Sequence, residues 1–187
     1  KPPSDANALW GFDWATTQLS AAPSPTPQPT ATALPTATPV DTATPTPLPP
    51  TRITIPKLGL DAPVVPVSLD PMQAQWQVPA MAAAGWHETS AALGVPGNMV
   101  LNGHNTTRGE VFRDLYRLEP GDAITVYSSG VAFRYAVSRV LILPELGQPR
   151  EVRERNASYL LPTQDERLTL VTCHPYGSLR NRLIVIA

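Results

Sequence analysis

Cysteine is almost absent from this sequence: among 187 residues there is one, Cys173. A single cysteine excludes a disulfide within the chain and a zinc site built from several cysteines. Charge is also scarce, at 16% of residues with a net charge of −1, so no basic surface field favours nucleic acid. No apolar run reaches the roughly 18 residues that a membrane-spanning helix needs, so none is predicted within this sequence.

Glycine is missing from residues 21–50, where proline, threonine and alanine predominate. Residues 1–50 hold 12 of the 23 prolines. Proline fixes φ and removes a backbone donor, so this stretch is predicted to be extended and not part of a helix or a central strand. Extended polyproline rises by about 3.1 Å per residue, which would let residues 21–50 reach roughly 90 Å. A stalk of that length and a tail without a spacing role both remain open.

An aromatic segment, residues 9–14, precedes this stretch and contains two tryptophans and a phenylalanine. Tryptophan favours the headgroup zone of membranes, so the segment could lie at a membrane interface. It could also dock on an apolar groove of the folded domain, or have no specific contact. We therefore divide the chain into an aromatic N-terminal segment (1–20), a Pro/Thr-rich linker or stalk (21–50) and a folded domain (51–187).

The folded domain is predicted to be all-β. Short runs of β-branched and aromatic residues alternate with turn residues, and strands at this density favour a closed barrel or a sandwich. Residues 131–138 alternate poorly and are expected to be buried on both faces. A short helix or 3₁₀ turn is expected in 110–118, and a short helical turn in 80–93 with Trp86 as core filling. The strand candidates are 52–56, 62–67, 98–102, 122–128, 131–140, 168–173 and 182–187.

Two of the predicted strands bring Cys173 close to an arginine. Cys173 ends one apolar run and Arg182 opens the next after a short turn, which predicts a β-hairpin. A guanidinium beside the thiol could stabilise a thiolate or a developing oxyanion, so this pair suits attack on a carbonyl group. A buried structural cysteine with a surface arginine is the alternative, since free cysteine is commonly buried. Arg180, two residues before Arg182, competes for the same role.

His104 supplies a third group. It follows the apolar run 98–102 and Gly103, at the end of a predicted strand. With Cys173 and Arg182 also at strand ends, a nucleophile, an acid or base and an electrostatic stabiliser are available together. A lone histidine is more often structural than catalytic, so only the combination of the three favours an enzyme.

Several motifs resemble those of the sortase family, in the expected order and at the expected spacing through about residues 51–187. The variant Cys173-His174-Pro175 looks most like class E or a related subgroup. The matching segments are Asn102-Gly103-His104 with 112–115 and 118–122 (histidine region), 169–173 with 182–185 (cysteine and arginine region), and 52–64 (opening strand).

This resemblance implies a closed eight-stranded β-barrel with short helices and loops, preceded by the Pro/Thr-rich extended tail. It also implies a cysteine transpeptidase, with Cys173 as nucleophile, His104 as acid and base, and Arg182 as oxyanion stabiliser. Thr172 resembles a family position that helps to shape the oxyanion pocket. Such an enzyme cleaves a protein's LPXTG- or LAXTG-like sorting signal after threonine. It then passes the protein from a thioester to an amine of the cell wall or a pilin.

Sortases carry an N-terminal membrane anchor, so the resemblance implies an anchor outside this sequence and a domain on the outer face of the bacterial plasma membrane. No cofactor or metal is expected. A zinc site from His104, Cys173 and another histidine is conceivable, but no paired ligand motif or acidic cluster supports a metal. A thiol peptidase that mainly hydrolyses and a non-catalytic stalked surface module remain alternatives.

Other features are expected to lie outside the chemistry. His174 would point away from Cys173 if the strand continues, because strand side chains alternate. His87 is expected on a surface loop. The Asn-x-Ser/Thr sequons at Asn105 and Asn156 are attributed to chance. The tetrapeptide 48–51 fits an LPXT core, with chance favoured over self-recognition.

Overall fold

The computed structural model describes residues 47–72 and 75–187, all within one compact unit. Our predictions for 1–20 and most of 21–50 lie outside the described residues. No helix in the described part is long and apolar enough to cross a membrane. The strands are β1 (Arg52–Ile55), β2 (Leu60–Val67), β3 (Leu69–Asp70), β4 (Gln75–Trp76), β5 (Ala84–His87), β6 (Gly97–Asn102), β7 (Ala123–Ser128), β8 (Val131–Ala136), β9 (Arg139–Pro144), β10 (Glu166–His174) and β11 (Asn181–Ile186). The helices are α1 (Arg150–Ala157) and the 3₁₀ helices η1 (Pro56–Leu58), η2 (Leu115–Arg117) and η3 (Ser158–Leu160).

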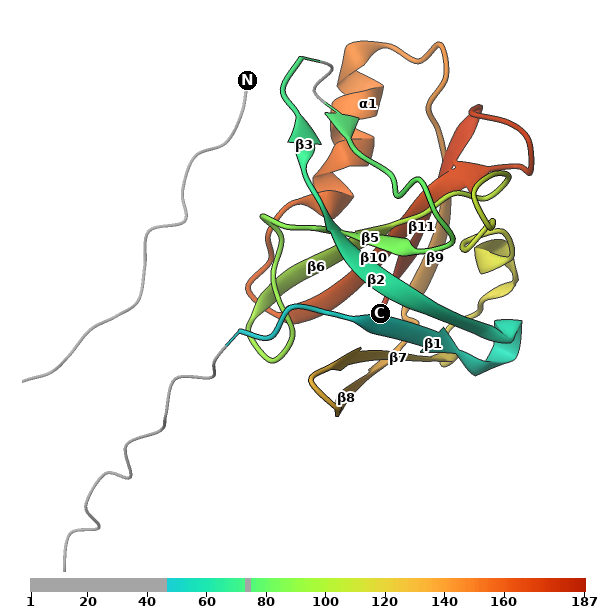
Figure 1. The fold of residues 1–187 in the computed structure, drawn as a ribbon. Coiled ribbons are helices and arrows are strands. Elements are labelled where there is room, and N and C mark those ends of the chain that lie inside the picture. The colour runs from blue at the N-terminus through green and yellow to red at the C-terminus, as the bar shows by residue number, and fades with distance from the viewer. Residues whose placement is uncertain (1–46, 73–74) are drawn as a thin grey trace, which may run out of the picture. The chain divides into compact units, whose positions relative to one another are not determined.

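Nine strands form one curled sheet in the order β8-β7-β1-β2-β5-β6-β10-β11-β9, and β3 pairs with β4 in a separate hairpin. The β2–β5 and β6–β10 pairs are parallel, and the other pairs of the large sheet are antiparallel. The end strands β8 and β9 are joined through residues 137–138. There, the N–H of Val137 donates to Asp122 and the N–H of Ser138 donates to Ile186. The predicted all-β, barrel-like fold is confirmed, with a closure that is approximate (Figure 1).

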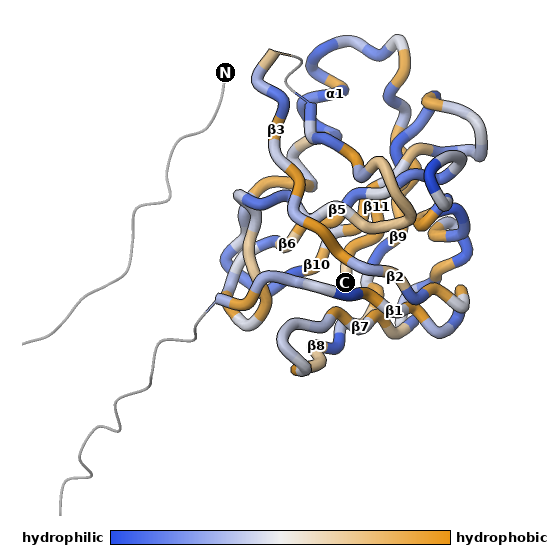
Figure 2. Tube along the Cα trace, viewed as in Figure 1, coloured by the Kyte–Doolittle hydropathy of each residue, from blue (hydrophilic) through white to orange (hydrophobic). Residues whose placement is uncertain are grey.

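The inner face of the sheet encloses one apolar core. Ile53 of β1, Leu170 of β10 and Leu183 of β11 belong to the same buried cluster, so strands from both sides of the curled sheet contribute to it. Figure 2 shows apolar stretches of the chain around the labels of β1, β10 and β11. In β10 and β11 consecutive residues are buried, so both faces of these two strands are covered. Phe112, Leu115 and Leu118 close the core from the segment that contains η2.

A second, smaller apolar cluster lies on the outer face of the sheet. Val100, Val171 and Ile184, from the adjacent strands β6, β10 and β11, are buried there. Tyr159 and Leu160 of η3 pack against them. The segment that follows α1 therefore covers part of this outer face. Because side chains alternate, the residue two positions beyond Val171 on β10 also belongs to this face.

Residues 131–140 form two strands where one was predicted. β8 ends at Ala136 and pairs with β7, whereas β9 starts at Arg139 and pairs with β11. The prediction that residues 131–138 are buried on both faces was wrong. In β8 only Phe133 and Tyr135 are half-buried, and the other residues of the strand are exposed. As an end strand of the sheet order, β8 has one strand neighbour and its outer side faces solvent.

The helical turn predicted in 80–93 is replaced by the short strand β5 between β2 and β6. The alanine-rich composition suggested a helix because alanine has the highest helix propensity. Gly85 is required in this strand, since a Cβ there would lie 2.4 Å from Asn102 Oδ1 and 2.9 Å from Val67 Cγ1. Trp86 packs against the core, as predicted, and its Nε1 donates to the Ala91 carbonyl at 3.1 Å.

The LPXT-like tetrapeptide is part of the folded domain. Leu48 and Leu93 exchange backbone hydrogen bonds of 3.3 and 2.9 Å, and the N–H of Thr51 donates to Tyr127 at 2.8 Å. Leu93 precedes β6, whereas His104 follows it, so the tetrapeptide is held at the other end of that strand. The folded region therefore begins a few residues before Thr51.

Candidate active site

Cys173 and Arg182 lie directly opposite each other on neighbouring strands. Cys173 is the penultimate residue of β10, Arg182 is the second residue of β11, and the antiparallel register pairs them. Arg182 Nη1 donates to Cys173 Sγ at 2.8 Å. The predicted β-hairpin is confirmed, and it brings the thiol and the guanidinium into contact.

The register also separates the two candidate arginines. Arg180 lies exposed in the turn before β11, whereas Arg182 is half-buried within the strand and faces Cys173. Cys173 lies two positions beyond Val171, so it shares the outer face of the sheet. His174 falls on the other face, as expected, and its ring lies 5.8 Å from that of Tyr116.

The loop that carries His104 is bonded to the strand that carries Cys173. β6 runs parallel to β10 up to Asn102, where the chain leaves the sheet. The N–H of Gly103 donates to the Val171 carbonyl at 3.3 Å, and Thr172 Oγ1 donates to the Gly103 carbonyl at 2.7 Å. Thr172 is buried, and its hydroxyl holds the carbonyl of the residue before His104.

Asn105 anchors the other side of His104. Its side-chain Nδ2 donates to the Cys173 carbonyl at 2.8 Å and to the Pro175 carbonyl at 3.3 Å, and Asn105 itself is only 6% exposed. Sequence reasoning missed this residue, because its sequon suggested only an accidental glycosylation motif. The sequence contains no local pattern that reveals a contact to a strand 68 positions away.

Close packing beneath the loop explains its glycine. A Cβ on Gly103 would lie 2.6 Å from Val111 Cγ1 and 2.8 Å from Phe112 Cδ2. Phe112 is fully buried, and its N–H donates to the His104 carbonyl at 3.0 Å. His104 is therefore held by bonds to its own carbonyl and to both of its neighbours in the chain.

His104 is half-buried, and its surroundings disfavour the charged form. Partial burial lowers the pKa of His104 below its ordinary value, and the positive charge of Arg108 lowers it further. At neutral pH the imidazole is therefore mainly neutral and able to accept a proton.

His87 is buried in the barrel wall, so its predicted place on a surface loop was wrong. It is 2% exposed, and its ring stacks on Trp76 with the centroids 4.0 Å apart. Asn102 Nδ2 lies 3.1 Å from His87 Nε2 and donates to the Gln77 carbonyl at 2.8 Å. With an amide donor facing it, Nε2 accepts and the ring is neutral. Burial lowers the pKa of His87 to about 4.

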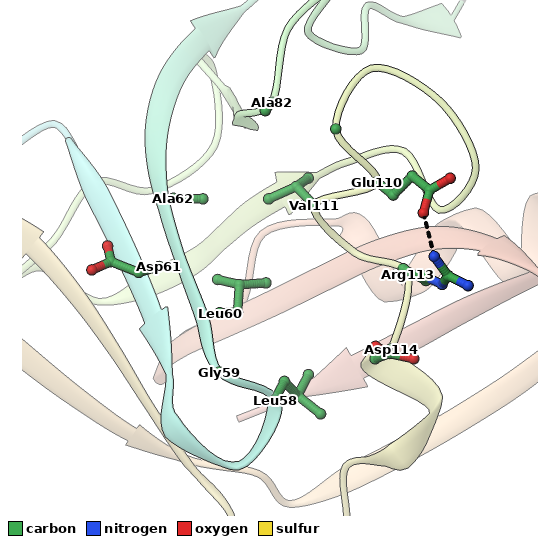
Figure 3. A pocket seen from close by; sticks show the side chains of 11 residues that line it. Leu58, Gly59, Leu60, Asp61, Ala62, Ala82, Glu110, Val111, Arg113 and Asp114 are labelled. Carbon is green, nitrogen blue, oxygen red and sulfur yellow. Dashed lines mark hydrogen bonds and ion pairs between the residues drawn. The ribbon is translucent and has the colours of Figure 1, made fainter.

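A cavity of about 320 Å³ lies between β2 and residues 109–114 of the segment that follows His104. Figure 3 shows Leu60, Ala62 and Val111 turned toward one another across it, while Asp61 points to the other side of β2. None of the three candidate catalytic side chains lines this cavity. Among the described residues, no group of His, Cys, Asp and Glu is placed to hold a metal ion.

The fold of the domain agrees with what comparisons to known proteins show. A sequence model of the sortase domain matches residues 53–187. Sortase SrtE1 of Streptomyces coelicolor is 33% identical over 97 residues, which are 48% of this chain and 25% of that relative. The crystal structure of sortase E1 from Streptomyces coelicolor, with a tripeptide in its active site, matches with a TM-score of 0.57 and 26% identity. The match covers 74% of this chain and 86% of that one.

A Clostridium perfringens sortase D5 transpeptidase matches with a TM-score of 0.55 and 27% identity, over 74% of this chain and 77% of the other. The chain belongs to the sortase family. Its similarity to sortase E1 confirms the resemblance to class E. The chain spans about a quarter of the length of the SrtE1 relative that it matches.

Proposed function

We propose that this protein is a sortase-type cysteine transpeptidase in which Cys173 is the nucleophile. The observation that carries the proposal is the 2.8 Å contact between Arg182 Nη1 and Cys173 Sγ. Reactive thiolates are found beside such positively charged donors. The His104 loop, bonded to the same strand, supplies the acid and base.

In the first half of the reaction, neutral His104 takes the proton of the Cys173 thiol, and the resulting thiolate attacks the carbonyl carbon of the peptide bond after threonine. The carbonyl oxygen becomes an oxyanion, and the Arg182 guanidinium stabilises it. The C–N bond then breaks, and protonated His104 gives its proton to the leaving amine. The product is a thioester on Cys173, with neutral His104 beside it.

In the second half, an acceptor amine attacks the thioester carbon. Neutral His104 takes a proton from the amine as the new C–N bond forms. The C–S bond breaks, which returns Cys173 to the thiolate and His104 to the protonated state. Thr172 supports this site indirectly, because its hydroxyl holds the Gly103 carbonyl.

The substrate is a protein with a C-terminal LPXTG- or LAXTG-like sorting signal. The similarity to sortase E1, whose crystal structure holds a tripeptide in the active site, supports a peptide in this site. The acceptor is an amine of a cell-wall precursor or a pilin. Sortases are typically membrane-associated enzymes of the cell surface, so the proposed location is the outer face of the bacterial plasma membrane, through an N-terminal anchor.

Two other functions are weighed against this one. A thiol peptidase would use the same half-reaction and pass the acyl group to water. A non-catalytic surface module would have no need for a half-exposed thiol in contact with a guanidinium. Membership of the sortase family favours transfer to an amine over both.

The test is cleavage of LPXTG and LAXTG peptides by the full chain, with and without an acceptor amine. We expect cleavage after threonine, a ligated product when the amine is present, and no reaction with Cys173→Ala. Cleavage that gives only the free acid at high amine concentration would identify a hydrolase. No cleavage of either peptide by a protein whose Cys173 reacts with iodoacetamide would reject the proposal.

A further inference from the structure

Asn105 occupies a position where the parallel ladder between β6 and β10 would otherwise continue. In a parallel pair the hydrogen bonds are evenly spaced, advancing two residues on each strand. The N–H of Gly103 donates to the Val171 carbonyl. The next bond in this register would join the N–H of residue 105 to the carbonyl of Cys173.

The structure forms that next bond with a side chain. β6 ends at Asn102, and the Cys173 carbonyl accepts a hydrogen bond from Asn105 Nδ2 at 2.8 Å. The second amide hydrogen of Asn105 reaches the Pro175 carbonyl at 3.3 Å. The ladder thus continues, but the length of one asparagine side chain separates the two backbones.

His104 lies where the two backbones are separated in this way. Gly103 is fixed to β10 by two hydrogen bonds. The Asn105 side chain is fixed by one bond to Cys173 of β10 and by one to Pro175, which follows the strand, so the backbone between Gly103 and Asn105 arches away from β10. The carbonyl of His104 is in turn held by the N–H of Phe112. Such an arch leaves room between the two backbones at His104 that a continuous ladder would fill.

We infer that Asn105 is a positioning residue that sets the separation between the His104 imidazole and the Cys173 thiol by replacing a backbone hydrogen bond with a side-chain amide. Asn105 acts through its neighbours and does not touch the substrate. The inference rests on the proposed function for its catalytic consequence. The spacing itself can be tested without a peptide substrate.

The chain offers a matched control in Asn98, at the other end of β6. Asn98 is 2% exposed, and its Nδ2 also donates to two backbone carbonyls, those of Tyr159 and Leu161, at 3.0 Å each. Loss of either asparagine breaks a buried two-carbonyl contact and destabilises the fold. Only Asn105 lies beside the catalytic groups.

The first arm of the experiment measures the rate of thioester formation with the LAXTG peptide. It compares wild type with Asn105→Ala, Asn105→Gln and Asn98→Ala, and a melting curve is recorded for each protein. We expect both Asn105 variants to lose about 10- to 100-fold in rate constant with KM little changed, as a misplacement near one ångström can cause. Asn105→Gln keeps both donors and so remains folded if Asn105→Ala does not. Equal losses in Asn98→Ala and the Asn105 variants, or wild-type rates in Asn105→Gln, would overturn the inference.

The second arm measures the pH dependence of Cys173 alkylation by iodoacetamide in wild type, Asn105→Gln and His104→Ala. We expect the Asn105→Gln profile to move from that of wild type toward that of His104→Ala. Identical profiles for Asn105→Gln and wild type would overturn the inference, as would a wild-type profile unchanged by His104→Ala. If wild type acylates no peptide while this arm behaves as expected, the proposed function fails and the spacing role stands.

Discussion

The guanidinium that contacts the Cys173 thiol can be compared with that of Arg180, two residues earlier in the chain. Arg182 lies in β11 opposite Cys173, whereas Arg180 is exposed in the preceding turn. We expect Arg182→Gln to slow thioester formation by about 10²- to 10³-fold, the usual effect of removing one oxyanion donor. Single-turnover acylation measures this loss.

Arg180→Gln is the control for this prediction, because it removes the same charge from the same hairpin. It should acylate at close to the wild-type rate. Similar losses in the two variants would mean that the positive charge of the turn, and not the contact with Cys173 Sγ, supports the reaction.

The protonation of His104 depends on its burial and on one neighbouring charge. Partial burial is the larger cause of its lowered pKa, and the positive charge of Arg108 lowers the pKa further. Arg108→Asn removes that charge, so the protonated form becomes easier to reach and the pKa of His104 should rise. Asparagine suits the site because Arg108 has a φ of 52°, a region that asparagine tolerates. NMR titration of the imidazole measures the change.

Two control measurements test whether the charge of Arg108 causes this change in the pKa of His104. Arg134→Gln, on the end strand β8, should leave the pKa of His104 unchanged. Added salt should narrow the difference between wild type and Arg108→Asn, because exposed charges are screened. A pKa of His104 that stays the same, or falls, in Arg108→Asn would contradict the electrostatic account.

At the scale of single residues, much of the site could be predicted from the sequence. The predictions that failed did so for physical reasons. Cys173 and Arg182 flank a short turn between two apolar runs, so their pairing follows from a local hairpin. Asn105 contacts a strand 68 residues away, a relation set by where a parallel ladder ends. The prediction that His87 lies on a surface loop after Trp86 was wrong, because His87 ends the buried strand β5.

At the scale of elements, the His104 loop and the turn between β10 and β11 are joined by a small side-chain network. Tyr176 Oη donates to Glu110 Oε1 at 2.7 Å, and Arg113 Nη1 donates to Glu110 Oε2 at 2.7 Å. The Arg113 guanidinium lies over the Tyr176 ring, 4.7 Å from its centroid. The network joins the segments that follow His104 and Cys173.

Removal of one hydroxyl tests whether this network restrains the turn. Tyr176→Phe should increase hydrogen–deuterium exchange in residues 105–114 and 175–180 while the strands remain protected, because the hydrogen bond to Glu110 is lost. Mass spectrometry of peptic fragments measures the exchange. Tyr116→Phe is the control, since the ring of Tyr116 contacts His174. Unchanged exchange in Tyr176→Phe would show that the turn is held by other contacts.

The prediction of elements succeeded where a strand carries its own pattern. β10 and β11 are rich in valine, isoleucine and leucine and were predicted with nearly their observed bounds. β5 was missed because four residues with two small side chains carry no strand pattern and gain their structure from pairing with β2 and β6. The break between β8 and β9 depends on which strand each half pairs with, which the sequence does not specify locally.

At the scale of the whole molecule, His87 should make stability depend on pH. The unfolded chain binds a proton at His87 near its ordinary pKa of about 6.5, whereas the folded chain does so only near pH 4. Between these values the unfolded state binds more protons, so the free energy of unfolding falls as the pH is lowered. At pH 4.5 we expect this residue to account for a loss of about 2–3 kcal/mol relative to pH 7.

Urea unfolding of wild type and His87→Gln at pH 7 and pH 4.5 isolates this contribution. Glutamine keeps an acceptor for Asn102 but does not titrate, so the drop in unfolding free energy should be smaller in the variant by that amount. Carboxylates and the other histidines titrate in both proteins and cancel in the comparison. Equal pH dependence in the two proteins would show that His87 is protonated in the folded state at pH 4.5.

The central claim is that Cys173 accepts an acyl group from a sorting signal, and the mass of the intact protein tests it most directly. After mixing with an LAXTG peptide and quenching in acid, wild type should carry a thioester adduct equal to the peptide fragment that ends in threonine. The adduct should be absent from Cys173→Ala and should leave the protein when an amine is added. An unmodified mass with both LAXTG and LPXTG peptides, from a protein that iodoacetamide still alkylates at Cys173, would contradict the account.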